Sequence, residues 1–164
     1  MKKFFNDNKH NPWFWAFLFV ALFFMFLMPI MSQSAGNSGD EDGFQIPQGE
    51  NVLNYYKTDH QDTTCMTFEN LKYYGCSFDV VMAWVNTTFH VNNISTTRHA
   101  ANAFLGWVVV LFVGLIVYRM GGWRAGVLAM ILMFISPRFL GHSFNNPKDI
   151  PLAAGVFISV LGWK

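Results

Sequence analysis

Charged residues are scarce in this sequence, and their scarcity limits what the chain can be. Asp, Glu, Lys and Arg make up 13% of the 164 residues, whereas a soluble domain usually carries about 25%. The formal net charge is +1. No basic stripe with interleaved aromatic residues is present, so nucleic-acid binding is not predicted.

Cysteine is equally rare, with Cys65 and Cys76 as the two examples. They do not form the CxxC spacing typical of metal sites, and no His, Cys and carboxylate cluster stands at ligand spacing, so no metal site is predicted. Both lie in the polar stretch after the first apolar run, where an oxidising compartment would allow them to pair. A disulfide and two free thiols both remain open.

Long apolar runs are abundant instead. Hydrophobic residue types reach 52% and aromatic types 18%, and they gather in runs, which is typical of membrane-spanning segments. Residues 12–32 hold the first run, WFWAFLFVALFFMFLMPIM after its leading proline. Its length predicts a first transmembrane helix with Pro12 in the first turn.

The residues before this run predict its orientation. Lys2, Lys3 and Lys9 lie in residues 1–11, and positive charge beside a spanning helix favours the cytoplasmic side. Residues 1–11 are therefore predicted to be a cytoplasmic tail. A secretory signal peptide cleaved near Ser34 is the alternative, although its apolar core would exceed the usual length of about 7–15 residues.

Two more helices follow a long polar segment. Residues 98–118 predict a second transmembrane helix, and residues 119–124 a cytoplasmic turn, because Arg119 and Arg124 lie there. Residues 125–136 predict a short third transmembrane helix, about 18 Å long at 1.5 Å per residue. The cytoplasmic turn agrees with the cytoplasmic tail, because two spans separated by an external loop return the chain to the same side.

The end of the sequence predicts another loop and an unfinished span. Pro137 ends the third helix, and residues 137–149 are predicted to be a second external loop. Residues 150–164 would start a fourth transmembrane helix, but they fall short of the roughly 20 residues that a crossing requires. We therefore expect a truncated chain, the fragment of a larger fold.

The polar residues 33–97 are predicted to be the first external loop. Residues 52–56 suggest a short helix. Phe78, Val81, Met82, Val85 and Phe89 recur at helical spacing, with Asp79 off the stripe, which predicts an amphipathic helix on the membrane surface. A small soluble core helix is the alternative. The fold class predicted is an all-α polytopic membrane protein whose external loop carries membrane-surface helices.

Ionisable residues gather in the two external loops, and their chemistry suits transfer from a phosphate. A carboxylate can accept the proton of an attacking hydroxyl, and cations can hold a departing phosphate. Each group also has a simpler explanation. An acidic cluster after a helix is often a solvated flank, Arg98 and Lys148 could be interfacial anchors, and His142 alone is more often a satisfied polar residue than a ligand.

Three motifs carry a resemblance to a known family. They are Asp40-Glu41-Asp42-Gly43-Phe44, the stretch RHAANAFLG at residues 98–106, and SPRFLGHSFNNPKDIP at residues 136–151. In this order the chain resembles the membrane glycosyltransferases of the GT-C fold. More narrowly, it resembles a bacterial group of the glycosyltransferase family 39 type, which is related to protein O-mannosyltransferases and to the lipid A aminoarabinose transferase. The resemblance covers the N-terminal third of a full-length member.

The resemblance implies a GT-C helical bundle and an inverting transfer of a sugar from a polyprenyl-phosphate donor. The acceptor would be a protein, lipid or glycan at the external face of a bacterial inner membrane. By this likeness Asp40 is the general base, Glu41 supports it, Arg98 contacts the donor phosphate, and Asp149 is a second catalytic carboxylate. Asp42 is the alternative base.

Three more substrate-binding residues are our own electrostatic additions, Lys148, Arg138 and His142. No cofactor is predicted beyond the lipid-linked sugar, and the resemblance does not decide whether a divalent metal takes part. Two other functions stay open. A transporter would place charged residues within its spans, whereas these runs carry only the polar Asn102. A non-catalytic anchor or assembly subunit would use the external loop as a binding surface.

Overall fold

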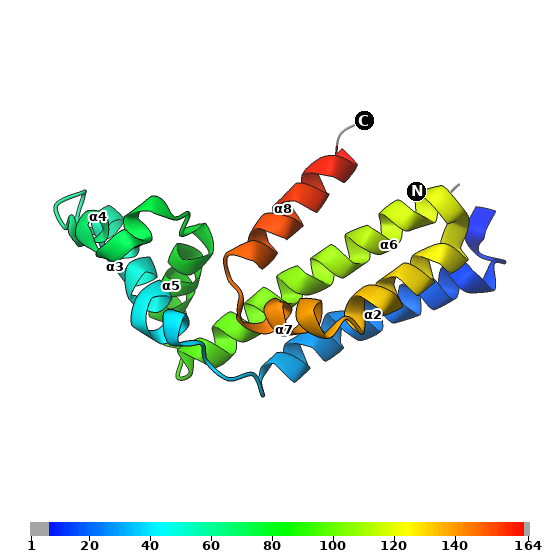
Figure 1. Cartoon of the computed structure of the whole chain (residues 1–164), viewed down its shortest axis with the longest axis horizontal. Helices are drawn as coiled ribbons and strands as arrows, with labels where there is room; N and C mark the ends of the chain where they lie inside the picture. The colour runs from blue at the N-terminus through cyan, green and yellow to red at the C-terminus, as the bar shows by residue number, and fades with distance from the viewer. Residues whose placement is uncertain (1–6, 163–164) are drawn as a thin grey trace.

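The computed structural model describes residues 7–162, and within that range it is helical and has no strand. Two long rods, α2 and α6, lie side by side, with α8 beside α6 and a lobe of shorter helices at one end (Figure 1). The expected cytoplasmic lysines Lys2 and Lys3 lie outside the described residues. The helices are α2 Pro12–Ser32, the π-helix η1 Glu41–Gln45, α3 Ile46–Lys57, α4 Thr64–Thr67, the 3-10 helix η2 Glu69–Tyr73, α5 Ser77–Phe89, α6 Ile94–Phe134, α7 Pro137–Asn145 and α8 Asp149–Gly162.

Two helices, α2 and α6, are long and apolar enough to cross a membrane. The first begins where the sequence predicts, because Pro12 occupies its first turn and the side chain of Asn11 accepts a hydrogen bond of 2.9 Å from the Trp13 amide. Residues 7–162 are therefore all-α, with two apolar helices of membrane-spanning length. The side of the membrane that each end faces stays a prediction.

One face of α2 packs against α6 and follows a seven-residue repeat. Phe14, Phe17, Ala21, Phe24 and Met28 are buried at alternating steps of three and four, which is the spacing that keeps one stripe on a partner helix. The opposite face of α2 is apolar and exposed. A helix that is apolar all round, with one packed stripe, matches a helix whose other face meets lipid.

A single glycine reverses the chain within α6. Gly122 has φ +77° and ψ 179°, so α6 consists of two helical arms, residues 94–121 and 123–134. Figure 1 shows the chain turning back on itself there. The expected six-residue turn at 119–124 is thus too long, because a residue without Cβ can adopt this conformation and both arms stay helical up to it. The first arm also begins earlier than residue 98, at Ile94, where Asn93 caps it.

The arms of this hairpin approach each other backbone to backbone. A Cβ added to Gly126 would lie 2.8 Å from the carbonyl oxygen of Gly114 and 3.0 Å from the Phe17 ring. Small residues allow this close approach, which is how helices pack within membranes. The short arm 123–134 therefore lies close to both α2 and the long arm.

The expected loop at 137–149 is largely a helix, α7. Pro137 ends the preceding helix, as predicted, but it also occupies the first turn of α7, where its missing N–H is no loss. Phe139, Leu140 and Phe144 pack against the core, and Ser143 is buried. Leu140 and Phe144 are four residues apart and Phe139 adjoins Leu140, so the three side chains share one face of a helix. The polar residues between them made this helical pattern hard to recognise in the sequence.

The lobe at one end of the rods is built on the contact between α3 and α5. Gly49 of α3 lies against the backbone of Asp79, where an added Cβ would be 2.6 Å from the carbonyl oxygen. The α3 helix includes the short helix predicted at 52–56. The stripe predicted for α5 is wrong in part, because Val81 and Phe89 are 57% and 68% exposed while Asp79 is buried. The packed face of α5 includes Asp79, because this carboxylate is bound by Arg98 of α6.

We predict that Gly126→Ala destabilises the protein and that Gly141→Ala, also in a helix, does not. The new methyl group at residue 126 would collide with the Gly114 backbone, which cannot move aside, whereas residue 141 faces open space. Overpacking of this kind costs about 1–3 kcal/mol. Thermal unfolding in detergent measures both variants, and an equal melting temperature for the two would contradict this packing.

Candidate functional site

Four ionisable side chains meet in a buried cluster where the lobe joins the rods. Glu41 comes from η1, Asp79 from α5, and Arg98 and His99 from the first turns of α6. Their exposed fractions are 1%, 5%, 2% and 2%. Three segments that are far apart in the sequence therefore share one charged centre, which we call the Arg98 cluster.

Hydrogen bonds hold every member of the Arg98 cluster. The Nε of Arg98 donates to Oε1 of Glu41 at 3.3 Å, and its Nη2 donates to Oδ1 of Asp79 at 2.5 Å. The other Glu41 oxygen lies 2.8 Å from Nε2 of His99. Removing one partner from such a buried pair costs about 3–5 kcal/mol because it leaves an uncompensated charge. The cluster therefore fixes η1 and α5 on α6.

The Arg98 cluster holds more potential negative charge than permanent positive charge. Glu41 and Asp79 face one guanidinium, so the carboxylates outnumber the permanent cation beside them. Burial raises the pKa of Asp79, and its hydrogen bond to Arg98 only partly offsets this effect. Asp79 is thus a position in the cluster that can take up a proton.

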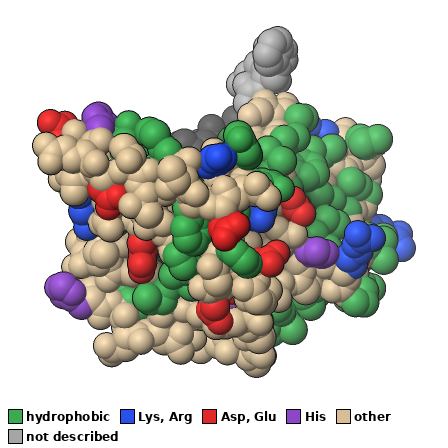
Figure 2. Space-filling view, turned by 60° about the vertical axis from the view of Figure 1, so that its left-hand side comes forward, with side chains coloured by type: hydrophobic (Ala, Val, Ile, Leu, Met, Phe, Trp, Pro, Cys, Tyr) green, Lys and Arg blue, Asp and Glu red, His purple; other side chains and the backbone are tan. Residues whose placement is uncertain are grey.

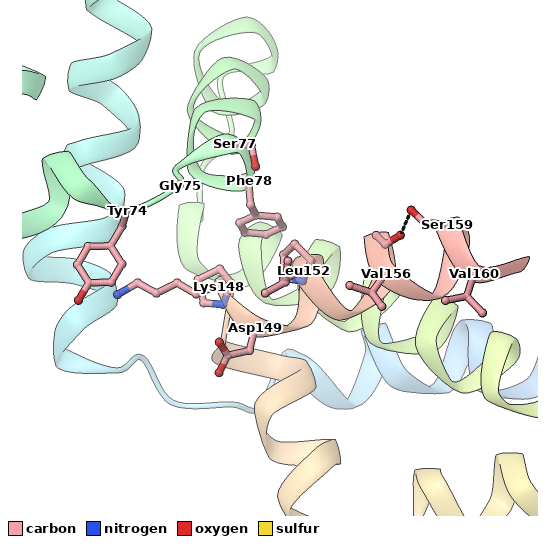
Figure 3. Close-up of a pocket in the computed structure, with 13 residues that line it drawn as sticks. Tyr74, Gly75, Ser77, Phe78, Lys148, Asp149, Leu152, Val156, Ser159 and Val160 are labelled. Atoms are coloured by element: carbon pink, nitrogen blue, oxygen red, sulfur yellow. Dashed lines mark hydrogen bonds between the residues drawn. The ribbon is translucent and has the colours of Figure 1, made fainter. Parts of the chain in front are cut away.

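A groove lies directly beside the cluster. Arg98 sits 5.5 Å from the centre of the Phe78 ring, and Phe78 lines a cavity of about 770 Å³ between α8 and the segment before α5. Figure 3 shows Lys148 extending toward Tyr74, with Phe78 beside Leu152 of α8. Together these residues form an amphipathic groove, with polar groups at one end and the α8 wall leading away from them.

The polar end of this groove is held by Lys148 and its neighbours. The ammonium of Lys148 lies 4.7 Å from the centre of the Tyr74 ring, a cation–π contact. Asn146 caps the start of α8, because its Oδ1 accepts from the amide of Asp149 at 3.1 Å. Its Nδ2 donates to Asp149 Oδ2 and contacts His142 Nδ1. Asn146 was not among the site residues predicted from the sequence.

The remaining predicted residues lie on the surface. Asp40 is exposed at the start of η1, where its side chain makes no capping hydrogen bond. Both carboxylate oxygens of Asp42 accept from Asn37 at 3.0 Å. Arg138 and His142 are exposed on α7 beside a shallow pocket of about 250 Å³. Asp149 is exposed next to Lys148.

The structure thus distributes the predicted residues over separate places. Glu41 and Arg98 meet in the buried cluster, Lys148 and Asp149 line the groove, and Asp40 lies on the surface next in sequence to Glu41. Arg98 was predicted to contact a donor phosphate. Its guanidinium is instead buried and bound by two carboxylates. The segments that carry these residues lie at one end of the rods, where α2 finishes and α6 and α8 begin (Figure 1).

Sequence reasoning missed Asp79, His99 and the role of Asn102. The Nδ2 of Asn102 donates to the backbone carbonyls of His142 and Ser143 at 3.2 and 3.1 Å, so it ties α7 to α6. A lone carboxylate within the apolar pattern of α5 was the available signal for Asp79. Within residues 7–162 no group of three or more His, Cys, Asp or Glu side chains is arranged to hold a metal ion.

Figure 2 shows acidic and basic side chains close together on the face that includes the lobe, with apolar surface beside them. The comparisons with known proteins give no further guidance to this site: no protein-family model, curated protein or solved structure matches the chain.

We predict that Asp79→Asn removes a pH dependence from the stability of the protein. A carboxyl whose pKa is raised by folding stabilises the folded state below its ordinary value of 3.8, and this contribution is lost as the pH rises through the raised pKa. The melting temperature of the wild type should therefore fall relative to that of Asp79→Asn as the pH increases from about 4 to 7.

Thermal unfolding across this range, with the exposed Asp59→Asn as a control, measures the effect. Asp59→Asn should keep the pH dependence of the wild type, because its side chain lies outside the cluster. A difference between wild type and Asp79→Asn that is the same at every pH would contradict the account.

Proposed function

We propose that this chain is part of a GT-C membrane glycosyltransferase that moves a sugar from a polyprenyl-phosphate donor to a protein, lipid or glycan acceptor at the external face of the membrane. The supporting observation is the amphipathic groove. One wall of the groove is the apolar face of α8, and Lys148 stands at its polar end. This is the end of the rods at which the acidic residues 40–42 follow α2. The family resemblance of the motifs at residues 40–44, 98–106 and 136–151 supports the same reaction.

The groove matches the chemistry of a lipid phosphate. Leu152, Val156 and Val160 line it at intervals of four residues along α8, which gives an apolar wall about 12 Å long. Lys148 stands at the polar end, and an ammonium group binds phosphate as a point charge. The isoprenoid chain would lie along α8, with the phosphate at Lys148. Because a cation–π contact at an exposed site is worth only about 0.5–1 kcal/mol, a phosphate can draw Lys148 away from Tyr74.

In the proposed reaction an acceptor hydroxyl or amine attacks the anomeric carbon from the face opposite the phosphate. The bond from that carbon to the phosphate oxygen breaks, and polyprenyl phosphate leaves with the bonding electrons. Asp40 takes the acceptor proton as general base, and Lys148 offsets the charge on the leaving phosphate. Asp40 is the better candidate than Asp42 because Asn37 occupies both oxygens of Asp42.

The Arg98 cluster takes a positioning role in this proposal. Arg98 holds Glu41, the residue next to Asp40, and holds Asp79, the residue next to Phe78 in the groove wall. One guanidinium therefore sets the distance between the candidate base and the candidate donor groove. This role replaces the direct phosphate contact expected for Arg98.

We predict that Lys148→Met weakens donor binding about tenfold or more, because it removes the charge that pairs with the phosphate. Labelling of the protein in membranes by a photoreactive polyprenyl phosphate measures this binding. Arg138→Met is the matched control, since Arg138 is a cation near the same end but does not line the groove. Equal labelling of the two variants would remove Lys148 from the phosphate site.

We also predict that Asp40→Asn lowers sugar transfer about 100-fold or more while donor labelling is kept, because a general base contributes to the chemical step. Transfer from a set of synthetic polyprenyl-phosphate monosaccharides by the full-length protein that contains this chain, embedded in membrane, measures the rate, with Asp42→Asn as the neighbouring control. Full activity of Asp40→Asn together with loss in Asp42→Asn would assign the base to Asp42. Absence of transfer with every donor, despite labelling, would favour a lipid-binding anchor.

A further inference from the structure

A second cavity lies at the opposite end of the rods, beside the Gly122 reversal. It has a volume of about 600 Å³ and opens between α2 and the long arm of α6. Its lining is apolar and aromatic except at one edge, where Arg119 stands. We propose that this cavity binds one anionic glycerophospholipid, with an acyl chain between the helices and the phosphate at Arg119.

The shape of the cavity follows the chemistry of such a lipid. Leu111, Leu115 and Arg119 line it at intervals of four residues on one face of α6, so the backbone of Arg119 is about 12 Å from that of Leu111 along the helix axis. Phe14 and Leu18 face them from α2 at the same interval. A phospholipid has its charged headgroup at the membrane surface and its acyl chain toward the middle of the bilayer. The cavity has the same order, with Arg119 near the helix end and apolar side chains toward the middle of the span.

Aromatic residues indicate that Arg119 lies at headgroup depth. Tyr118 stacks on Trp123 with 3.7 Å between the ring centres, and Trp13 lies 5.4 Å from the guanidinium carbon of Arg124. Tyr and Trp concentrate at the interface between bilayer and water. The same rings make the cavity walls rigid, because Trp123 also packs edge-on against Phe14, so little order has to be imposed when a chain enters.

The charge at this end selects an anionic lipid. Lys9, Arg119 and Arg124 lie there against one carboxylate among the described residues, Asp7. Within residues 7–162 Arg119 is exposed and has no hydrogen bond or ion pair with another side chain. A phosphate bound bidentately by a guanidinium is among the stronger charge-assisted contacts. Covering the cavity with a further apolar helix would bury Arg119 without a partner, which is unfavourable.

This lipid site is independent of the proposed sugar transfer. The groove at Lys148 and the cavity at Arg119 share no lining residue. The start of α8, which carries Lys148, and the Gly122 reversal within α6 lie at opposite ends of the rods (Figure 1). The lipid site rests only on α2 and α6 crossing a membrane. Loss of either proposal leaves the other in place.

Native mass spectrometry of the full chain, released from nanodiscs, tests the site with two probes, phosphatidylglycerol and phosphatidylcholine of the same acyl chains. The wild type should retain one phosphatidylglycerol with about tenfold preference. Both lipids present a phosphate, but the quaternary ammonium of phosphatidylcholine cancels its charge and is repelled by the cations at this end. Arg119→Gln should reduce this affinity to that of phosphatidylcholine. Leu115→Trp fills the cavity and should abolish retention of both lipids.

Two matched controls separate the site from general attraction to charge and surface. Arg124→Gln removes a neighbouring cation that does not line the cavity, and Leu132→Trp enlarges an exposed leucine on the short arm. Leu132→Trp should bind lipid as the wild type does, and Arg124→Gln should lose much less affinity than Arg119→Gln. Equal retention of the two lipids by the wild type, or an equal loss in Arg124→Gln, would overturn the proposal. So would dimers cross-linked through Leu115→Cys in place of lipid retention. If Leu115→Trp fails to fold, the two arginine variants decide.

Discussion

The arrangement of this protein depends on the neutralisation of one buried guanidinium. Arg98 can be buried at the start of α6 only if carboxylates reach it, and Glu41 and Asp79 reach it from two separate segments. An unpaired charge in that position would be strongly destabilising. The lobe is therefore attached to the rods at a defined point, and Asp40 and Phe78, the immediate neighbours of those carboxylates, are placed with it.

The rods themselves were largely predictable, because their determinants are local. The apolar runs fixed the positions of α2 and α6, and the arginines near the Gly122 reversal marked the turn. The three- and four-residue spacing of Phe14, Phe17 and Ala21 can be read from the sequence once a partner helix is assumed. What the pattern left out is how sharply the chain reverses, since one glycine with positive φ replaces the expected turn.

The candidate site was predictable only in part, because its partners are joined by tertiary contacts. The motifs included Glu41 and Arg98 but not Asp79, the second carboxylate that Arg98 binds. Asp79 is 19 residues from Arg98 and 38 from Glu41 in the sequence, and it lies outside every motif. Amphipathic spacing assigned Asp79 to the solvent side of α5, since a helical pattern cannot show that a carboxylate has a buried cation waiting for it. In the same way, polar residues made α7 look like a loop although its apolar residues keep helical spacing.

Both proposed lipid sites combine an apolar helix wall with one cation, and the difference between the cations fits their different tasks. Lys148 rests on the Tyr74 ring, and a flexible ammonium with a weak resting contact can engage a phosphate and release it in each cycle. Arg119 stands at the edge of a rigid aromatic cavity, and a planar guanidinium that binds bidentately suits a lipid that stays. A donor site must exchange its ligand, whereas a lipid bound between α2 and α6 would act as a permanent part of the packing of the two rods.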